Sequence, residues 1–211
     1  MRLTNPKAAL VGGLLILSLS AFAEESKIQV EEPSRLRLFG RGGLAMGGNS
    51  IVSGSYTDNT TWDIRAGAGA IFAIGGEFQL TYQWSIQATK GYQREKTNAT
   101  DAEVKLTRAP QEVLVFYEVA PQWKLGAGLR QDKNIGMTWY KDGGSSGSTK
   151  FEDTNGTVLE AQYLFTPRDK KSQRSLQAGL SLRVVRQDLK NNDWQKTYNA
   201  NQVGLSVFFY Y

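Results

Sequence analysis

The chain has 211 residues, a formal net charge of +5 at pH 7, and neither cysteine nor histidine. This composition excludes a disulfide scaffold and any metal site built from imidazole or thiolate ligands. The mild positive charge lacks a basic stripe with interleaved aromatic residues, which argues against nucleic acid as a partner. We expect no cofactor, no metal and no nucleic-acid partner.

The first 23 residues have the order of a secretory signal peptide. Two basic residues precede an apolar run over residues 8–19, and Ala21 and Ala23 form a small-x-small cleavage site. The alternative, a transmembrane anchor, needs about 20 apolar residues, which is more than this run provides. We predict cleavage after Ala23, a short acidic periplasmic lead-in at 24–34, and one folded domain at 35–211.

Beyond the lead-in, apolar residues recur at every second position, which is the period of a strand with two unlike faces. The clearest segment runs from Glu77 to Thr89, where every even-numbered residue is apolar. The same period predicts eight strands, and an even number suits antiparallel closure. The expected strands cover about residues 35–45, 61–74, 77–89, 111–119, 122–129, 157–165, 175–187 and 203–211.

The connections between these strands alternate between short and long. Short turns are expected at 74–76, 120–122 and 166–173. Long polar loops are expected at about 47–60, 93–108, 133–150 and 188–198. Tight turns on one rim and long loops on the other are typical of outer-membrane barrels, whose short turns are periplasmic.

The alternation alone leaves two interpretations, a membrane barrel with its apolar face outward and a soluble barrel with that face inward. The apolar faces carry no charge within the expected spans, and large aromatic residues lie toward strand ends, as interfacial girdles would. The other face is rich in Gly, Ser, Thr and Gln and carries charges of both signs, which suits a narrow lumen. We therefore predict an all-β fold, an eight-stranded antiparallel up-and-down transmembrane β-barrel.

The C-terminal segment Val203 to Tyr211 alternates to its last residue. It resembles the signal by which the outer-membrane assembly machinery recognises barrel proteins, with Phe209 and Tyr211 in the outward aromatic positions. The whole chain after the leader resembles small eight-stranded barrels of the OmpA, OmpX and OmpW kind, in architecture rather than in any motif. The resemblance implies a monomer in the outer membrane of a Gram-negative bacterium. Its implied partners are outer-membrane lipids, including lipopolysaccharide, and the barrel assembly machinery.

Charged residues on the lumen face are expected to pair, because an isolated charge in a water-poor interior is costly. A turn centred on Pro121 makes cross-strand neighbours of residues whose numbers add to 242. Cross-strand neighbours interact directly. This register predicts two lumen ion pairs: Glu112 with Arg130, and Glu118 with Lys124.

Six apolar residues share the inward face in strand halves expected to lie near the periplasmic end. We predict that they form an apolar floor: Phe39, Ile71, Phe116, Leu164, Phe208 and Tyr210. Eight strands leave an interior just wide enough for side chains to fill, so we expect a filled lumen. The alternative is a narrow pore, or a binding pocket for small, apolar molecules.

Without histidine, the chain has no Ser–His–acid triad. The remaining catalytic arrangement is a pair of carboxylates among Glu112, Asp132 and Glu160, and a salt-bridge network explains the same residues. We predict that the protein is not an enzyme.

The fifth strand keeps alternating past the membrane, which predicts a protruding extracellular hairpin that exposes Trp139 and Tyr140. Such a hairpin is either an adhesive edge for an extracellular ligand or a plain strand extension. Lysines in the outer loops either contact lipopolysaccharide phosphates or are simply solvated. We expect a structural or surface-interaction role through these loops.

Overall fold

The computed structural model describes residues 35–211 except 56–60, 100–101, 142–143, 145 and 167–175. The expected signal peptide and lead-in, residues 1–34, lie outside the described residues. Within the described part of the chain, no helix has the length and apolar character needed to cross a membrane.

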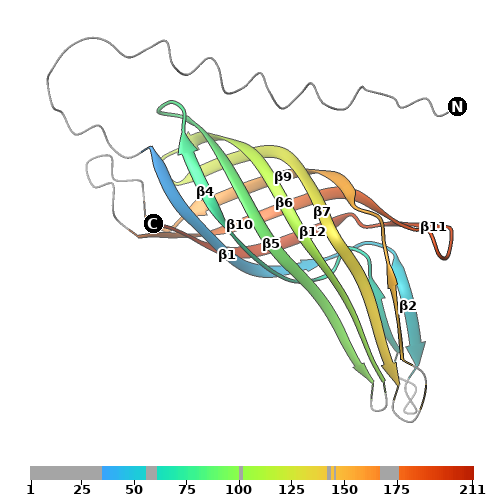
Figure 1. Ribbon diagram of the computed structural model, residues 1–211. Coiled ribbons are helices and arrows are strands. Elements are labelled where there is room, and N and C mark those ends of the chain that lie inside the picture. Colours follow the sequence, from blue (N-terminus) through green and yellow to red (C-terminus); the bar gives the residue numbers. More distant parts are fainter. Residues whose placement is uncertain (1–34, 56–60, 100–101, 142–143, 145, 167–175) are drawn as a thin grey trace, which may run out of the picture. The chain divides into compact units, whose positions relative to one another are not determined.

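The described residues form twelve strands, drawn in Figure 1. Their bounds are β1 (Leu36–Met46), β2 (Ser50–Ser55), β3 (Thr61–Arg65), β4 (Gly69–Gln79), β5 (Trp84–Ala99), β6 (Ala102–Ala120), β7 (Trp123–Lys141), β8 (Gly147–Lys150), β9 (Thr154–Leu164), β10 (Gln177–Asn191), β11 (Lys196–Asn199) and β12 (Gln202–Tyr210).

Eight of these strands close into a barrel in the order β1-β4-β5-β6-β7-β9-β10-β12, and every neighbouring pair is antiparallel. The seam joins the two ends of the domain, where Phe39 of β1 lies opposite Tyr210 of β12. The predicted fold class, an eight-stranded antiparallel barrel, is confirmed.

The outside of the barrel is an apolar belt, because side chains alternate between its two faces. β10 shows the pattern most regularly, with buried and exposed residues in turn along its length. The belt includes Leu38, Leu44, Phe72, Ile74, Val113, Leu125, Leu129, Leu159, Leu182 and Leu205, each at least half-exposed. Tilted aromatic pairs lie on this face near the short turns, with Trp84 against Tyr117 and Trp123 against Tyr163.

The clearest predicted strand, Glu77 to Thr89, is wrong as a single element. The chain turns between Gln79 and Ser85, which face each other across β4 and β5, while Gly75 lies inside β4 and not in a turn. A Cβ at Gly75 would come within 2.0 Å of a carbonyl oxygen on β5, so the sheet needs glycine there. The turn residues Leu80 and Tyr82 are exposed and apolar like the belt, so the alternation continues across the turn.

The predicted strand at 61–74 is also divided, into β3 and β4. The chain turns between them and enters β4 through Gly69, whose φ of 123° is accessible to glycine without strain. β3 pairs with β2 outside the barrel sheet, so Ile64 is fully buried and does not belong to the belt. In the alternation over 61–74, Asp63 and Arg65 lie on the polar face that predicts the lumen, but the structure shows them as an exposed ion pair at 2.7 Å.

The loops expected at 93–108 and 133–150 are largely strand. β5, β6 and β7 run on past the barrel as one sheet, β8 adds to the edge of β7, and the hairpin of β2 and β3 packs against it (Figure 1). We call these outer lengths of β5–β7, with β8, the β2–β3 hairpin and the β10–β11 hairpin that contributes to the same core, the outer module.

One β-bulge changes which side of β7 faces inward. Up to Asp132 the even-numbered residues of β7 are buried, whereas beyond Asn134 the odd-numbered Ile135 and Met137 are buried. The register shifts between Thr107 and Ala109 on the partner strand, and Asn134 has a φ of 52°. Asparagine tolerates this left-handed conformation better than most residues. The bulge therefore turns an apolar pattern that faces outward on the barrel into one that faces inward on the module.

Candidate functional site

Glu112 on β6 is the centre of an ion network in the lumen. Its side chain is buried and accepts hydrogen bonds from Arg130 at 3.1 Å, from Arg183 at 2.7 Å, and from Arg41. Arg41 also donates to Glu160 at 2.9 Å. Three cations around one carboxylate offset the cost of removing these charges from water, which an isolated charge does not recover.

Glu77 on β4 is the centre of a second network, closer to the short turns. Its carboxylate accepts hydrogen bonds from Arg37 at 2.6 Å, from Lys124 at 2.7 and 2.9 Å, and from the Tyr210 hydroxyl at 2.8 Å. The Arg37 guanidinium lies 4.2 Å from the centre of the Tyr210 ring, in cation–π geometry.

The register predicted from Pro121 is present in the structure. Glu112 lies opposite Arg130 and Glu118 opposite Lys124, and the first pair is hydrogen-bonded as described above. The short bonds of Lys124 go to Glu77, on a strand that is not its neighbour. Hairpin register identifies which residues are neighbours on adjacent strands, but it does not predict which residues meet across the lumen.

Asp132 connects the central network to Arg108, a residue within the loop that the sequence predicts at 93–108. Its carboxylate accepts hydrogen bonds from Arg130 at 2.6 Å, from Gln187 at 2.8 Å and from Arg108 at 3.5 Å. Arg108 is fully buried in β6 and was assigned to the loop at 93–108. The even-numbered polar residues of β6 could have located it, since Glu112 occupies the same face.

The three carboxylates considered for acid–base chemistry are Glu112, Asp132 and Glu160. Each is at most 3% exposed, and each is hydrogen-bonded to at least one guanidinium. These ion pairs order the lumen. Among the residues that the structure describes, no group of three or more His, Cys, Asp or Glu side chains could hold a metal ion.

Four of the six residues predicted for the apolar floor form one buried cluster, Phe39, Leu164, Phe208 and Tyr210. Phe39 stacks on Phe208 with ring centres 6.0 Å apart. Ile71 is buried elsewhere, opposite Gly43, because the turn that was thought to follow it comes several residues later. Phe116 belongs to a separate cluster with Leu114, Val158 and Val185.

The outer module has a hydrophobic core of its own. The buried residues come from the β3 end, from β6 and β7, and from the segments around β8, β10 and β11. They are Ile64, Ala66, Val104, Leu106, Ile135, Met137, Phe151, Leu189 and Ala200. A packed core in this position makes the region beyond the belt a folded unit that caps the barrel.

Trp139 and Tyr140 were expected to be exposed together, and the structure separates them. Consecutive strand residues point to opposite faces, so Tyr140 is 57% exposed while Trp139 packs against the module core. The Trp139 ring lies across Gly147 of β8, where a Cβ would come within 2.3 Å of it. The prediction that both aromatic side chains are exposed is therefore wrong.

Glu95 connects the β2–β3 hairpin to β5, beyond Tyr92 and outside the belt. Its carboxylate accepts a hydrogen bond from the backbone N–H of Arg65 at 2.9 Å. Burial raises the pKa of Glu95 to about 7, although the Arg65 hydrogen bond and the charge of Arg108 act in the opposite direction. The contact therefore changes protonation near neutral pH.

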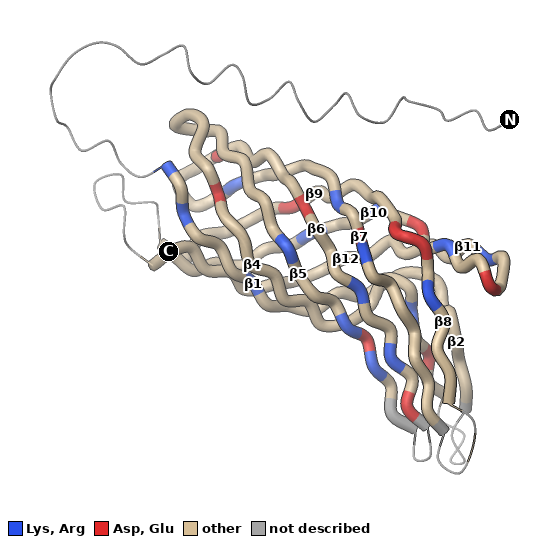
Figure 2. Tube along the Cα trace, in the orientation of Figure 1, with Lys and Arg blue, Asp and Glu red and all other residues tan. Residues whose placement is uncertain are grey.

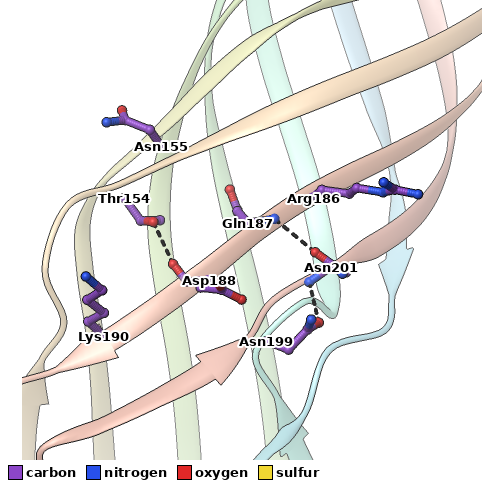
Figure 3. A pocket seen from close by; sticks show the side chains of 8 residues that line it. All are labelled: Thr154, Asn155, Arg186, Gln187, Asp188, Lys190, Asn199 and Asn201. Carbon is purple, nitrogen blue, oxygen red and sulfur yellow. Dashed lines mark hydrogen bonds between the residues drawn. The ribbon is translucent and has the colours of Figure 1, made fainter.

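A polar hollow of about 460 Å³ lies where β9, β10 and β12 leave the barrel, next to β11 (Figure 3). Its lining residues are Thr154, Asn155, Arg186, Gln187, Asp188, Lys190, Asn199 and Asn201. Asn201 helps to shape the hollow, since its side-chain oxygen accepts the Gln187 backbone N–H at 3.0 Å. Amides and charges of both signs suit a polar, hydroxyl-bearing ligand.

The two residues of the C-terminal signal lie on the outward face of β12 and at its end. Phe209 is 47% and Tyr211 71% exposed, while Phe208 and Tyr210, which alternate with them, point into the floor cluster. The last strand thus contributes to both the belt and the floor.

No known family and no curated protein matches the chain. Among solved structures, it is similar to the neisserial surface protein A, with a TM-score of 0.46 and 13% identity over 84% of this chain and 96% of that one. It is similar to Ail, the attachment invasion locus protein of Yersinia pestis, solved with the heparin analogue sucrose octasulfate, with a TM-score of 0.46 and 10% identity over 84% and 99%. The outer membrane protein OprG from Pseudomonas aeruginosa gives 0.40 and 11% over 84% and 96%.

Proposed function

We propose that the protein is an integral outer-membrane β-barrel with a structural or surface-interaction role, exercised through its outer module. One observation carries this proposal. The strands that present apolar side chains outward on the barrel continue into a region where apolar side chains are packed inward. Such a change of face fits a chain that leaves hydrocarbon and enters water.

The apolar belt supports the membrane location. Exposed apolar area on this scale is unfavourable in water, and monomeric soluble proteins rarely expose large contiguous apolar patches. The aromatic pairs near the short turns fit an interfacial girdle. We expect the protein to require detergent or lipid and to migrate differently on gels before and after heating. A chain without its leader that stays folded and soluble in plain buffer would overturn this location.

We propose that the lumen is filled. The support is the pair of buried ion networks around Glu112 and Glu77 together with the floor cluster below them. The alternative is a narrow pore or a pocket for small molecules. Conductance across planar bilayers separates the two, because a filled barrel gives no stable openings. Stable openings whose conductance rises in Arg41→Ser would favour the pore.

The proposed partners follow from the location. Outer-membrane lipids, including lipopolysaccharide, would surround the belt, and the assembly machinery would read Phe209 and Tyr211 during biogenesis. An extracellular ligand would meet the outer module, with the polar hollow beside Arg186 as the first place to look. Loss of membrane insertion in cells for Phe209→Ala with Tyr211→Ala, but retained refolding in detergent, would support the assembly role.

A further inference from the structure

On the outward side of the outer module, basic side chains surround a patch of small residues. One cross-strand row runs from Arg94 on β5 to Thr107 on β6, then to Gly136 on β7 and Lys150 on β8. Neighbours on each strand are buried, so these four residues share the outward face. The row therefore has cations at its ends and small residues at its centre.

Two further lysines lie around the same patch of small residues. Lys105 lies two positions from Thr107 on the same face of β6, and Lys133 lies opposite Ala109 beside the bulge. Among the described residues, no carboxylate lies within 4.0 Å of any of the four cations. Glu103 forms an ion pair with Lys96 at 2.8 Å, and the charges of Lys105 and Arg94 act on it from farther away. We call this set the basic ring: Arg94, Lys105, Lys133 and Lys150.

The centre of the ring has room for a ligand. A Cβ built on Gly136 would meet only the carbonyl oxygen of Thr149, at 3.9 Å. The Thr107 hydroxyl lies there too and donates a long hydrogen bond of 3.4 Å to the Gly136 carbonyl oxygen, an acceptor that a phosphate oxygen would replace. Four like charges gathered on one surface repel one another, and an anion bound among them removes that repulsion. A phosphate group, with its charge and several acceptor oxygens, fits four flexible cations and a hydroxyl.

The position of the ring relative to the belt indicates the source of the phosphate. Below Arg94, the outward face of β5 continues through Tyr92 to Lys90, which lie opposite the belt residues Phe72 and Ile74. A lysine beside exposed apolar side chains can lay its stem along them and raise its charge to the headgroup level. Basic residues recur along the outer lengths of β5 to β8, as Figure 2 shows. One continuous surface thus connects the lipid belt to the ring.

We propose that the basic ring binds a phosphate on the headgroup of a glycolipid in the leaflet that surrounds the barrel. This inference rests on the proposed outer-membrane location and goes beyond it by naming the residues and the ligand chemistry. The four cations hold the phosphate, and the small residues Gly136 and Thr107 leave room for it. Binding would fix the outer module against the membrane surface.

The test compares two double variants of the full chain after its leader, refolded in a neutral detergent. Lys133→Gln with Lys150→Gln removes two charges from the ring. Arg35→Gln with Lys196→Gln removes two exposed charges that belong neither to the ring nor to the polar hollow. The probes are lipopolysaccharide, the same material after enzymatic removal of its phosphates, and inorganic phosphate, with binding followed by native mass spectrometry.

We expect the ring variant to bind phosphorylated lipopolysaccharide about 30-fold more weakly, given the usual contribution of each near-surface cation. The control variant should change little, and dephosphorylation should abolish the difference between the two. Gly136→Leu keeps every charge and fills the space above residue 136, so it should also weaken binding. Unchanged binding in Gly136→Leu, or equal losses in the two double variants, would show mere attraction to net charge and overturn the ring.

Inorganic phosphate that binds as tightly as the glycolipid would overturn the assignment to the leaflet. Heat-modifiable migration of every variant reports on the barrel separately. A chain that never folds in detergent contradicts the outer-membrane proposal itself. A folded chain whose ring variant binds lipopolysaccharide as tightly as the unsubstituted chain contradicts only this inference.

Discussion

The barrel and the outer module solve the same packing problem in opposite ways, although they share β5, β6 and β7. In the barrel the buried side holds ion networks and the exposed side is apolar. In the module the buried side is apolar and the exposed side carries charge. Both regions contain apolar and charged side chains on the same three strands. We therefore attribute their opposite arrangement to the medium that surrounds each region. Buried charges need partners wherever they are, and apolar groups need only be kept from water.

The largest effect should come from breaking the barrel's central network. Glu112→Gln leaves Arg41, Arg130 and Arg183 without their shared carboxylate, and removing one partner of buried ions costs about 3–5 kcal/mol. Urea unfolding in lipid vesicles measures the change. The exposed Asp153→Asn is the matched control and should have little effect. A Glu112 variant as stable as the control would mean that the network contributes no stability.

The next effect sharpens the contrast by acting on the module alone. Leu106→Ala removes a buried side chain from the module core and should cost about 2–5 kcal/mol of local stability. Hydrogen exchange should speed up in the outer lengths of β6 and β7 and stay slow in the barrel strands. Uniform acceleration through both regions would show that they unfold as one unit.

A smaller effect is expected at the bulge that divides the two regions. Asn134→Val places a β-branched residue at a φ of 52°, which should cost about 1–2 kcal/mol. Asn134→Gly retains access to that conformation and serves as the control. Protease susceptibility of the module compares the two, and equal susceptibility would show that the backbone conformation at this position is unimportant.

The smallest effect is a dependence on pH. Because the pKa of Glu95 rises from 4.5 to about 7 on folding, the folded module binds a proton that the unfolded chain releases between these values. Its stability should therefore fall as the pH rises from about 4.5 to 7 and level off above that. Proteolysis of the module at pH 5 and pH 8 measures the trend, and Glu95→Gln should flatten it. An equally steep trend in the variant would assign the effect to another group.

The sequence predicted the barrel and one hairpin register because both depend on local patterns. Alternation is a property of each strand, and Pro121 marked its own turn. The turn near Leu80 was missed because its exposed apolar residues continue the alternation of the strands on either side. Contacts across the lumen, such as Lys124 with Glu77, depend on the shear of the closed barrel, which no single segment encodes.

The position of Asn134 also affects which changes in length the chain can absorb. Asn134 is the extra residue of the bulge, so deleting it would restore regular alternation in β7 with Ile135 and Met137 still buried. Gly144 and Ser146 lie between β7 and β8, where gains or losses leave the sidedness of both strands intact. A single-residue deletion at Asn134 should therefore keep the module core, and a larger change at the tip should also be tolerated. Length variation among related sequences would then collect at the tip, with single-residue losses also found at the bulge.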